Sequence, residues 1–201
     1  MAKQLLHLPG VAGADEAGRG PLAGPVAAAA VVLPIDFDIT GINDSKKLDP
    51  AMRRTLSERI KATAQYAIEL SETEEIDTLN ILWASLAAMS RAVGRLEPMP
   101  QRVLIDGNRI PPGLTVPSEA VVKGDGIYAC IAAASILAKV ERDQIMTEAA
   151  KIYPQYGFDR NFGYPTPDHL EALKRHGPCP IHRRSFRPVM ECDQGCLIFE
   201  H

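Results

Sequence analysis

Two adjacent carboxylates lie between an apolar run and a glycine-rich turn near the start of the chain. They are Asp15 and Glu16, which follow the run 11–14 and precede the turn 17–25. A second apolar run at 26–33 completes a pattern typical of strand, tight turn and strand. A carboxylate close to a protein core needs a proton, a partner or a metal ion. The stretch therefore indicates either a divalent-metal site beside a phosphodiester-binding pocket or a solvated hairpin tip.

Two further carboxylates stand at the ends of predicted elements. Asp106 closes the apolar run 102–105, and Asp125 precedes the Ala-rich stretch 127–151. Sites in open α/β sheets form at the carboxyl ends of strands, which favours a functional role for Asp106. Asp125 stands where a helix N-cap belongs, so capping is its alternative role.

Four such carboxylates meeting in one crevice would make an all-oxygen site. Hard divalent cations such as Mg²⁺ and Mn²⁺ prefer oxygen ligands. Two ions ~3.5–4 Å apart can activate a water molecule and stabilise the leaving oxygen of a phosphodiester. The chain has neither a P-loop nor a dinucleotide-binding fingerprint, which leaves this chemistry as the one that the motifs favour.

The elements that must position these residues alternate between strands and helices. Apolar periodicity predicts helices over 50–64, from about 76 or 79 to 96, over 127–151 and over 167–176, and further strands over 64–70 and 119–122. Asp49 or Asp44 can cap the helix at 50, and Ser71 with Glu74 has the spacing of a capping box. Trp83 is predicted to pack. We expect a catalytic unit over 1–150, followed by an extension over 151–201 in the same compact unit.

The composition is that of an ordinary globular protein. The 201 residues are 46% hydrophobic and 23% charged, and no apolar run approaches the ~20 residues that span a bilayer. The N-terminus lacks a secretory hydrophobic region, so we expect a cytoplasmic protein. The formal net charge of −3 argues against a non-specific nucleic-acid coat protein but is compatible with a nuclease, because local basic patches can still hold phosphates.

The four cysteines give no strong metal motif. Cys130 falls in the Ala-rich helical pattern and is expected to be a small buried hydrophobe. Cys192 and Cys196, with His182 and His201 nearby, could form a zinc site, but no second metal-spaced pair accompanies them. Free thiols are the expectation.

Several basic and hydroxyl side chains are candidates for holding phosphate. Lys46 and Lys47 precede a predicted helix, where they either grip an anion or lie in a surface loop. Ser135 and Lys139 are four residues apart and share one helical face. Asp143 is expected to pair with a basic neighbour and to have no catalytic role.

Seven motifs resemble those of bacterial ribonuclease HII. They occur in that family's order between about residues 11 and 187, whereas 188–201 carry no known motif. In chain order they are Asp15-Glu16-Ala-Gly18-Arg19-Gly20, Asp44-Ser45-Lys46-Lys47-Leu48, Leu104-Ile105-Asp106-Gly107-Asn108, Lys123-Gly124-Asp125, Ala132-Ala-Ala-Ser135-Ile-Leu-Ala-Lys139-Val, Gly163-Tyr164-Pro165-Thr166 and His182-Arg183-Arg184-Ser185-Phe186.

The resemblance implies a ribonuclease H-like α/β fold, with a mixed central β-sheet flanked by α-helices and a small C-terminal helical extension. It implies endonucleolytic cleavage of the RNA strand of RNA–DNA hybrids and of single ribonucleotides embedded in duplex DNA. Cleavage would fall 5′ of the ribonucleotide and leave 3′-hydroxyl and 5′-phosphate ends, as ribonucleotide excision and RNA primer removal require. The family is usually monomeric, and the resemblance leaves a DNA-clamp partner open.

The resemblance also implies roles for individual residues. The metal-binding and catalytic set, which would hold two Mn²⁺ or Mg²⁺ ions with the substrate, is Asp15, Glu16, Asp106 and Asp125. The backbone of Gly18, Arg19 and Gly20 would contact the 2′-hydroxyl, the group that distinguishes RNA from DNA. Tyr164 would stack on the sugar of the next, deoxy, nucleotide. The residues expected to hold phosphates are Lys46, Lys47, Ser135, Lys139, Arg183 and Ser185.

Three other functions remain as alternatives. A catalytically silent nucleic-acid-binding module would not need the acidic cluster. A sister ribonuclease that requires runs of ribonucleotides carries an extra N-terminal domain, for which we expect no room before residue 11. A generic metal phosphohydrolase would need neither the Gly-Arg-Gly turn nor Tyr164. The sequence does not rank Mg²⁺ against Mn²⁺.

Overall fold

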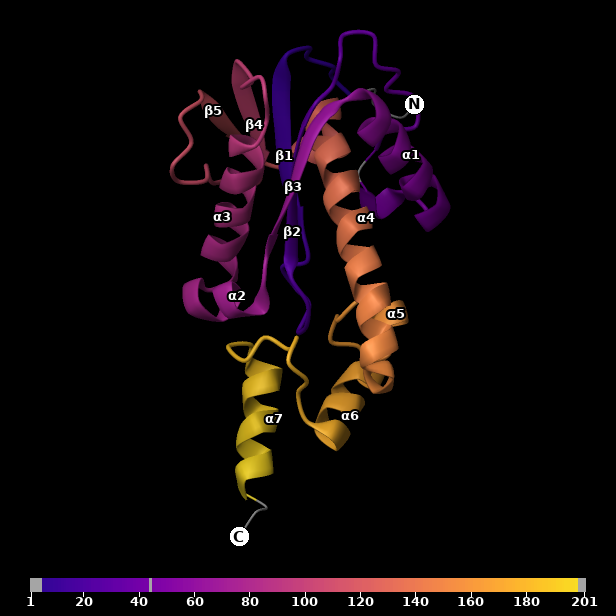
Figure 1. Ribbon diagram of the computed structural model, residues 1–201, viewed down its shortest axis with the longest axis vertical. Coiled ribbons are helices and arrows are strands. Elements are labelled where there is room, and N and C mark those ends of the chain that lie inside the picture. The colour runs from indigo at the N-terminus through magenta and orange to yellow at the C-terminus, as the bar shows by residue number, and fades with distance from the viewer. Residues whose placement is uncertain (1–4, 44, 199–201) are drawn as a thin grey trace.

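A five-stranded mixed sheet forms the centre of the molecule (Figure 1). The computed structural model describes residues 5–43 and 45–198, with side chains up to residue 193. The strands are β1 (Val11–Ala17), β2 (Val26–Val32), β3 (Gln65–Ser71), β4 (Arg102–Asp106) and β5 (Ser118–Val121). Their order is β3-β2-β1-β4-β5, in which β2 runs antiparallel to β1 and β3, whereas β4 runs parallel to β1 and β5. The first strand is therefore the central one.

Helices cover both faces of this sheet, and a smaller helical part extends beyond one end of it. The helices are α1 (Pro50–Thr63), α2 (Thr73–Leu79), α3 (Ile81–Gly94), α4 (Ala129–Ile152), α5 (Phe158–Asn161), α6 (Pro167–His176) and α7 (Arg187–Ile198). Figure 1 shows α1 and α4 on one face, α2 and α3 on the other, and α5 to α7 at the lower end. This arrangement confirms the predicted α/β class and the C-terminal helical extension.

Alternating small residues let both layers of helices approach the sheet closely. On β2, Ala28 and Ala30 belong to the core on the α3 side, whereas Ala29 and Val31 belong to the core on the α4 side. This alternation is the period of two that a strand imposes. On β1, a Cβ atom added to Gly13 would lie 2.2 Å from the carbonyl carbon of Cys130. Glycine therefore sets the distance between β1 and α4.

Two predictions about the segment 71–96 are wrong. The single predicted helix is divided at Asn80, whose φ of 66° interrupts α2 and whose side chain caps α3 by accepting from the N–H of Leu82. The capping box also fails, because Ser71 is still part of β3 and its hydroxyl donates to Glu75 at 2.6 Å. The N-cap position of α2 falls on Glu72, which makes no side-chain cap bond.

Other expectations about local structure have mixed outcomes. Asp49 caps α1 by accepting from the Met52 N–H at 2.9 Å, whereas Asp44 lies outside the described residues. Cys130 is buried as predicted, but Trp83 is 46% exposed and does not pack as expected. None of the described helices has the length and apolar character needed to cross a membrane.

Candidate active site

The strand register brings Asp15 and Asp106 together. Ala14 on β1 pairs with Ile105 on the parallel neighbour β4, so each aspartate is the next residue along its strand. Gly13 lies against α4, and Asp15, two residues later, faces the same side. Asp106 faces that side as well, because Leu104 packs there with Cys130 of α4. Both aspartates therefore stand at adjacent strand ends beneath α4.

Asp15 is a buried carboxylate with several partners. Its side chain is 5% exposed and accepts from the N–H of Glu16 at 2.7 Å. A hydrogen bond with Ser135 links it to α4, and the Ser135 hydroxyl lies 2.9 Å from that of Ser45. Burial raises the pKa of Asp15 well above its usual range, and the negative charges of Glu16 and Asp106 raise it further. In the absence of a cation, this site therefore favours a proton on Asp15.

Glu16 shares this electrostatic environment. Burial raises its pKa, the Arg19 guanidinium 3.3 Å away opposes that rise, and the charge of Asp106 adds to it. The site therefore brings three mutually repelling carboxylates together, with Arg19 paired to one of them.

The fourth carboxylate is tied to the others through the backbone. The N–H of Gly124 donates to the Asp106 carboxylate at 2.7 Å, and Asp125 is the next residue in the 3₁₀ turn Gly124–Gly126. The N-cap position of α4 falls on Tyr128, so the capping role considered for Asp125 is wrong. The turn instead places Asp125 directly after the group that holds Asp106.

The donor chemistry of this cluster fits a hard divalent cation. Its ligand atoms are carboxylate oxygens, and the buried charge of Asp15 needs neutralising. In the described part of the chain, no group of three or more His, Cys, Asp or Glu side chains is arranged so that it could hold a metal ion. The carboxylates at the carboxyl ends of β1 and β4 offer oxygen ligands, but the described side chains alone do not make a complete metal site.

The turn after β1 lies against the candidate sugar-stacking residue. A Cβ added to Gly20 would lie 3.5 Å from the Tyr164 ring, which is 41% exposed. Gly18 has a φ of +99°, and a Cβ there would lie 2.0 Å from the Arg142 guanidinium. The tertiary structure thus places the Gly-Arg-Gly turn and Tyr164 side by side, next to the carboxylates.

A pair of buried histidines holds the backbone of Tyr164. The Nδ1 atom of His169 lies 2.8 Å from the Tyr164 carbonyl oxygen, and its Nε2 atom lies 3.0 Å from Nε2 of His182. Nδ1 of His182 accepts from the Cys179 N–H at 3.0 Å. Each ring nitrogen thus has one role: His182 donates from Nε2 to His169, which donates from Nδ1 to the carbonyl. Burial lowers the pKa of both rings, that of His182 to about 4, which keeps this chain neutral.

The expectation that Arg183 holds a substrate phosphate needs correction. Its side chain is completely buried, and its guanidinium donates to backbone carbonyl groups of the turn. These belong to Gly18, Arg19, Pro21, Gly24 and Pro25. Because its N–H groups are enclosed by this turn, Arg183 holds the turn in place from the buried side and does not reach solvent.

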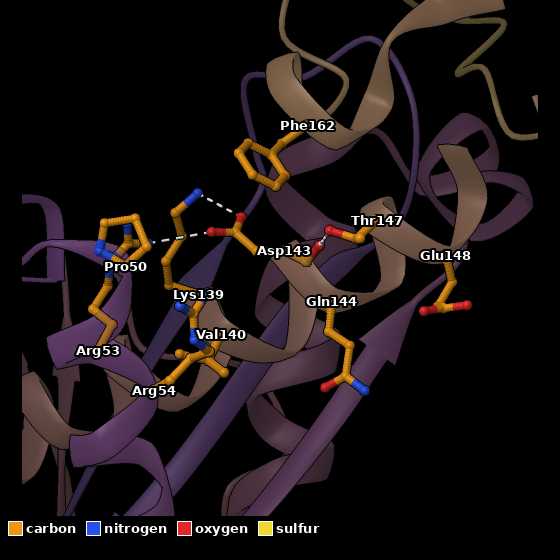
Figure 2. A pocket seen from close by; sticks show the side chains of 10 residues that line it. All are labelled: Pro50, Arg53, Arg54, Lys139, Val140, Asp143, Gln144, Thr147, Glu148 and Phe162. Atoms are coloured by element: carbon orange, nitrogen blue, oxygen red, sulfur yellow. Dashed lines mark hydrogen bonds and ion pairs between the residues drawn. The ribbon is translucent and has the colours of Figure 1, made fainter. Parts of the chain in front are cut away.

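Lys139 lies in a groove between α1 and α4 (Figure 2). Its ammonium group donates to Asp143 at 2.6 Å, and Arg53 reaches the same carboxylate at 3.2 Å. This confirms the predicted pairing of Asp143. The groove has a volume of about 330 Å³ and begins one helical turn beyond Ser135.

The remaining phosphate candidates lie on the surface in two places. Lys46 and Lys47 are exposed in the 3₁₀ turn Ser45–Lys47 and follow Ser45, whose hydroxyl contacts that of Ser135. Ser185 is exposed, and its hydroxyl donates to Asp77 at 2.6 Å. Asp77 also accepts from the backbone N–H groups of Arg184 and Ser185 at 2.9 Å. Sequence reasoning missed Asp77 and Arg142, because an isolated charged residue in a helix resembles solvated surface.

The comparisons with known proteins agree with this geometry. Residues 12–189 match the family Ribonuclease HII. The chain belongs to the ribonuclease HII family. A ribonuclease HII from Idiomarina loihiensis is 58% identical over 180 residues, which cover 89% of this chain and 96% of the relative. The ribonuclease H2 from Pyrococcus horikoshii OT3 has a TM-score of 0.77 at 29% identity, covering 92% of this chain and 97% of that one.

A more distant structure shares the fold. Bst-RNase HIII in complex with Mn²⁺ has a TM-score of 0.76 at 18% identity and is covered to 69% of its length. The predicted ribonuclease H-like fold is therefore confirmed, and the protein is a ribonuclease H enzyme. The family match also decides between ribonuclease HII and its sister type, in favour of the first.

Proposed function

We propose that this ribonuclease HII hydrolyses the RNA strand of RNA–DNA hybrids and cuts duplex DNA 5′ of a single embedded ribonucleotide, leaving 3′-hydroxyl and 5′-phosphate ends. The observation that carries this proposal is the position of Gly20 close to the Tyr164 ring, beside the carboxylates that end β1 and β4. A backbone turn and an exposed aromatic ring at a cluster of carboxylates suit a ribose, its neighbouring sugar and the phosphodiester between them.

Asp15, Glu16, Asp106 and Asp125 would hold two divalent ions, Mn²⁺ or Mg²⁺, in the substrate complex. Such ions, when bound, supply an activated water and neutralise charge on the leaving oxygen. The protein itself orients the carboxylates. The Gly124 N–H donates a hydrogen bond to Asp106, and Ser135 is hydrogen-bonded to Asp15. The substrate phosphate would complete the metal site.

Specificity would arise from two contacts on adjacent sugars. The backbone of the turn Gly18-Arg19-Gly20 would meet the 2′-hydroxyl, which is the difference between RNA and DNA at one nucleotide. The ring of Tyr164 would pack on the following deoxyribose, where a 2′-hydroxyl would crowd it. Together the two contacts would recognise an RNA–DNA junction.

Cations near the site would guide the phosphate backbone. Lys46 and Lys47 lie on the turn beside Ser135, and Lys139 lies in the groove next to them. Ser185 lies on the loop that Asp77 fixes. We propose that these groups contact phosphates on either side of the cleaved bond, and that residues 151–201 extend this substrate-binding surface.

We place this activity in the cytoplasm, on a monomer, in ribonucleotide excision and RNA primer removal. The thiols of Cys130 and Cys179, which form no disulfide, are those expected in a reducing compartment. Oligomeric state is measurable by sedimentation at the concentration used for activity.

The test uses a labelled DNA duplex with one ribonucleotide, an otherwise identical all-DNA duplex and a long RNA–DNA hybrid. Each is incubated with Mg²⁺, with Mn²⁺ or with chelator, and the product ends are mapped. We expect a metal-dependent cut only at the 5′ side of the ribonucleotide in the first duplex and distributed cuts in the hybrid. Cleavage of the hybrid alone would remove the single-ribonucleotide specificity. Folded protein that cuts neither would overturn the nuclease proposal in favour of a binding module.

A further inference from the structure

Two buried arginines lie beneath the turn that follows β1. Arg142 of α4 is 1% exposed, and Arg183 of the loop before α7 is 0% exposed. In the described part of the chain, the hydrogen bonds found for both guanidinium groups go to backbone carbonyl oxygens. Arg142 donates to Ala23, Pro25 and Phe162, and Arg183 donates to Gly18, Arg19, Pro21, Gly24 and Pro25.

Such an arrangement fixes the direction of whole peptide units. In a planar trans peptide, the carbonyl of one residue and the N–H of the next point in opposite directions. A carbonyl turned inward onto a guanidinium therefore turns the following N–H outward. Arginine suits this task because its rigid fork offers five donors, whereas lysine offers three on a flexible stem.

Two of the N–H groups turned away in this manner are used by the protein itself. The carbonyl of Pro21 bonds to Arg183, and the next N–H, that of Leu22, donates to Gly163 at 2.7 Å. The carbonyl of Ala23 bonds to Arg142, and the next N–H, that of Gly24, donates to Ile181 at 2.8 Å. These two bonds fasten the turn to the segment that carries Tyr164 and to the loop before α7.

Two more N–H groups are turned away from Arg183 at the surface. The carbonyl of Gly18 accepts from Arg183 at 2.6 Å, and that of Arg19 accepts at 3.1 Å. The N–H groups that follow, on Arg19 and Gly20, therefore point away from the buried guanidinium. Both residues are exposed, and Gly20 adjoins Tyr164.

We propose that Arg183 is a positioning residue that aims the N–H groups of Arg19 and Gly20 at the substrate's 2′-hydroxyl, and that Arg142 supports it by fixing the far end of the same turn at Ala23 and Pro25. This inference rests on the proposed function of the Gly-Arg-Gly turn and adds the device that sets its geometry. Among the residues that the structure describes, no carboxylate is hydrogen-bonded to either guanidinium, so the two arginines also leave net positive charge beneath a turn that faces a phosphodiester. Burial lowers the pKa of Arg142 to about 10 and that of Arg183 to about 9, and both groups are still protonated at neutral pH.

The first test compares Arg183→Lys and Arg142→Lys with Arg184→Lys as the matched control, since the exposed Arg184 guanidinium bonds to Asp193 and Pro178. The readouts are KM for the single-ribonucleotide duplex and the inhibition constant of the identical all-DNA duplex. We expect KM to rise about tenfold in Arg183→Lys, because the hydrogen bonds from the Arg19 and Gly20 N–H groups to the 2′-hydroxyl are weakened, while the DNA inhibition constant stays unchanged. The rise should be smaller in Arg142→Lys, because the carbonyl groups that Arg142 holds do not precede Arg19 or Gly20. The control should change neither constant.

A merely structural role would lower the melting temperature or the active fraction without separating KM from the inhibition constant. A folded Arg183→Lys variant that keeps both constants at the wild-type values would overturn the proposal. Wild-type protein that fails to prefer the ribonucleotide duplex would instead overturn the proposed function, whatever the variants do.

Amide hydrogen exchange in the free wild-type protein gives a second test that needs no substrate and no variant. We expect fast exchange for the N–H groups of Arg19 and Gly20 and slow exchange for those of Leu22 and Gly24. Equal protection of all four would show that the first two do not face outward, and the proposal would fail even if the lysine variants could not be folded.

Discussion

At the scale of the residue, Asp106 separates a role in chemistry from a role in folding. Its carboxylate accepts from the Gly124 N–H at 2.7 Å, a bond that an asparagine side chain can also accept. We therefore expect Asp106→Asn to keep the fold but to lose the negative charge that a divalent cation requires. Removing one preorganised electrostatic group at an active site costs about 10²–10³ in kcat.

The measurement is kcat on the ribonucleotide duplex, alongside the melting temperature. Asp36→Asn is the matched control, because Asp36 is exposed beyond the end of β2 that pairs with the start of β1, away from Asp15. Turnover by Asp106→Asn within a few fold of wild type would remove Asp106 from the catalytic set.

Tyr164 contributes a ring, and its hydroxyl group has no role in the proposed contact with the sugar. We expect Tyr164→Ala to lower kcat/KM at an RNA–DNA junction by roughly 5- to 150-fold, the ~1–3 kcal/mol of a nucleotide–aromatic contact. Tyr164→Phe keeps the ring and should retain most of the activity. Equal loss in both variants would assign the effect to the hydroxyl, and no loss in either would end the stacking role.

At the scale of the element, the packing of β1 on α4 determines where Asp15 meets Ser135. A Cβ at Gly13 would lie 2.2 Å from the backbone of Cys130, a contact that no rotamer change relieves. We expect Gly13→Ala to destabilise the fold by ~3 kcal/mol or more, at the upper end of overpacking effects. Gly94→Ala is the control: nothing lies within 4 Å of its added Cβ, and alanine there should be neutral or stabilising.

Chemical denaturation of both variants measures this difference. Gly13→Ala with wild-type stability would mean that β1 and α4 can separate without cost. In Gly13→Ala, the added Cβ should push β1 away from α4 and so move Asp15 away from Ser135. The activity of this variant should therefore fall by more than its folded fraction does.

The histidine pair joins α6 to the loop before α7 and makes stability depend on pH. Burial lowers the pKa of His182 to about 4 from an unfolded value near ~6.5. The folded state therefore favours the neutral ring. The contribution of His182 to the free energy of unfolding is fully present above pH ~6.5, and on the order of 2–3 kcal/mol of it is lost as the pH falls towards 4. The groups that face it are His169, Cys179, Tyr156, Arg184 and Asp193.

The measurement is the free energy of unfolding of wild type and His182→Gln between pH 7 and 4. Glutamine does not titrate, so the variant should show a shallower decline, and the difference between the two curves removes the contribution of the carboxylates. The exposed His176, as His176→Gln, is the control. Parallel curves for wild type and His182→Gln would show that His182 is not kept neutral by the fold.

At the scale of the whole molecule, the acidic site is a source of instability that a cation should relieve. The raised pKa of Asp15 means that its ionised form is disfavoured in the folded state. That cost is present at neutral pH, shrinks as the pH falls below the raised folded pKa and is gone below the unfolded pKa. We expect Mg²⁺ or Mn²⁺ to raise the melting temperature, by roughly 5–10 °C at about 100 times Kd, which corresponds to ~2.7 kcal/mol.

Asp15→Asn removes the buried charge, so its melting temperature in chelator should be higher than that of wild type. Adding metal should raise its melting temperature by less than it raises that of wild type. Differential scanning calorimetry with and without chelator tests both at once. A variant that is less stable than wild type in chelator would show that ionised Asp15 is compensated without metal.

The sequence by itself determined the alternation of elements, the carboxylates at their ends and the family motifs, because apolar periodicity and turn residues are local properties. It predicted β1, β2 and β4 closely, and it singled out the Gly-Arg-Gly turn and Tyr164. It misplaced the break at Asn80, since a left-handed residue within an apolar helical pattern leaves no periodic signal.

Only the tertiary structure decided which residues meet. The parallel register of β1 and β4 places Asp15 beside Asp106. The hydrogen bond from the Gly124 N–H to Asp106 brings the turn that carries Asp125 to the same place. It also reversed the role of Arg183, whose motif suggested a phosphate contact. Whether a guanidinium reaches solvent or backbone carbonyls depends on the burial that distant segments create, and no spacing along the chain encodes that burial.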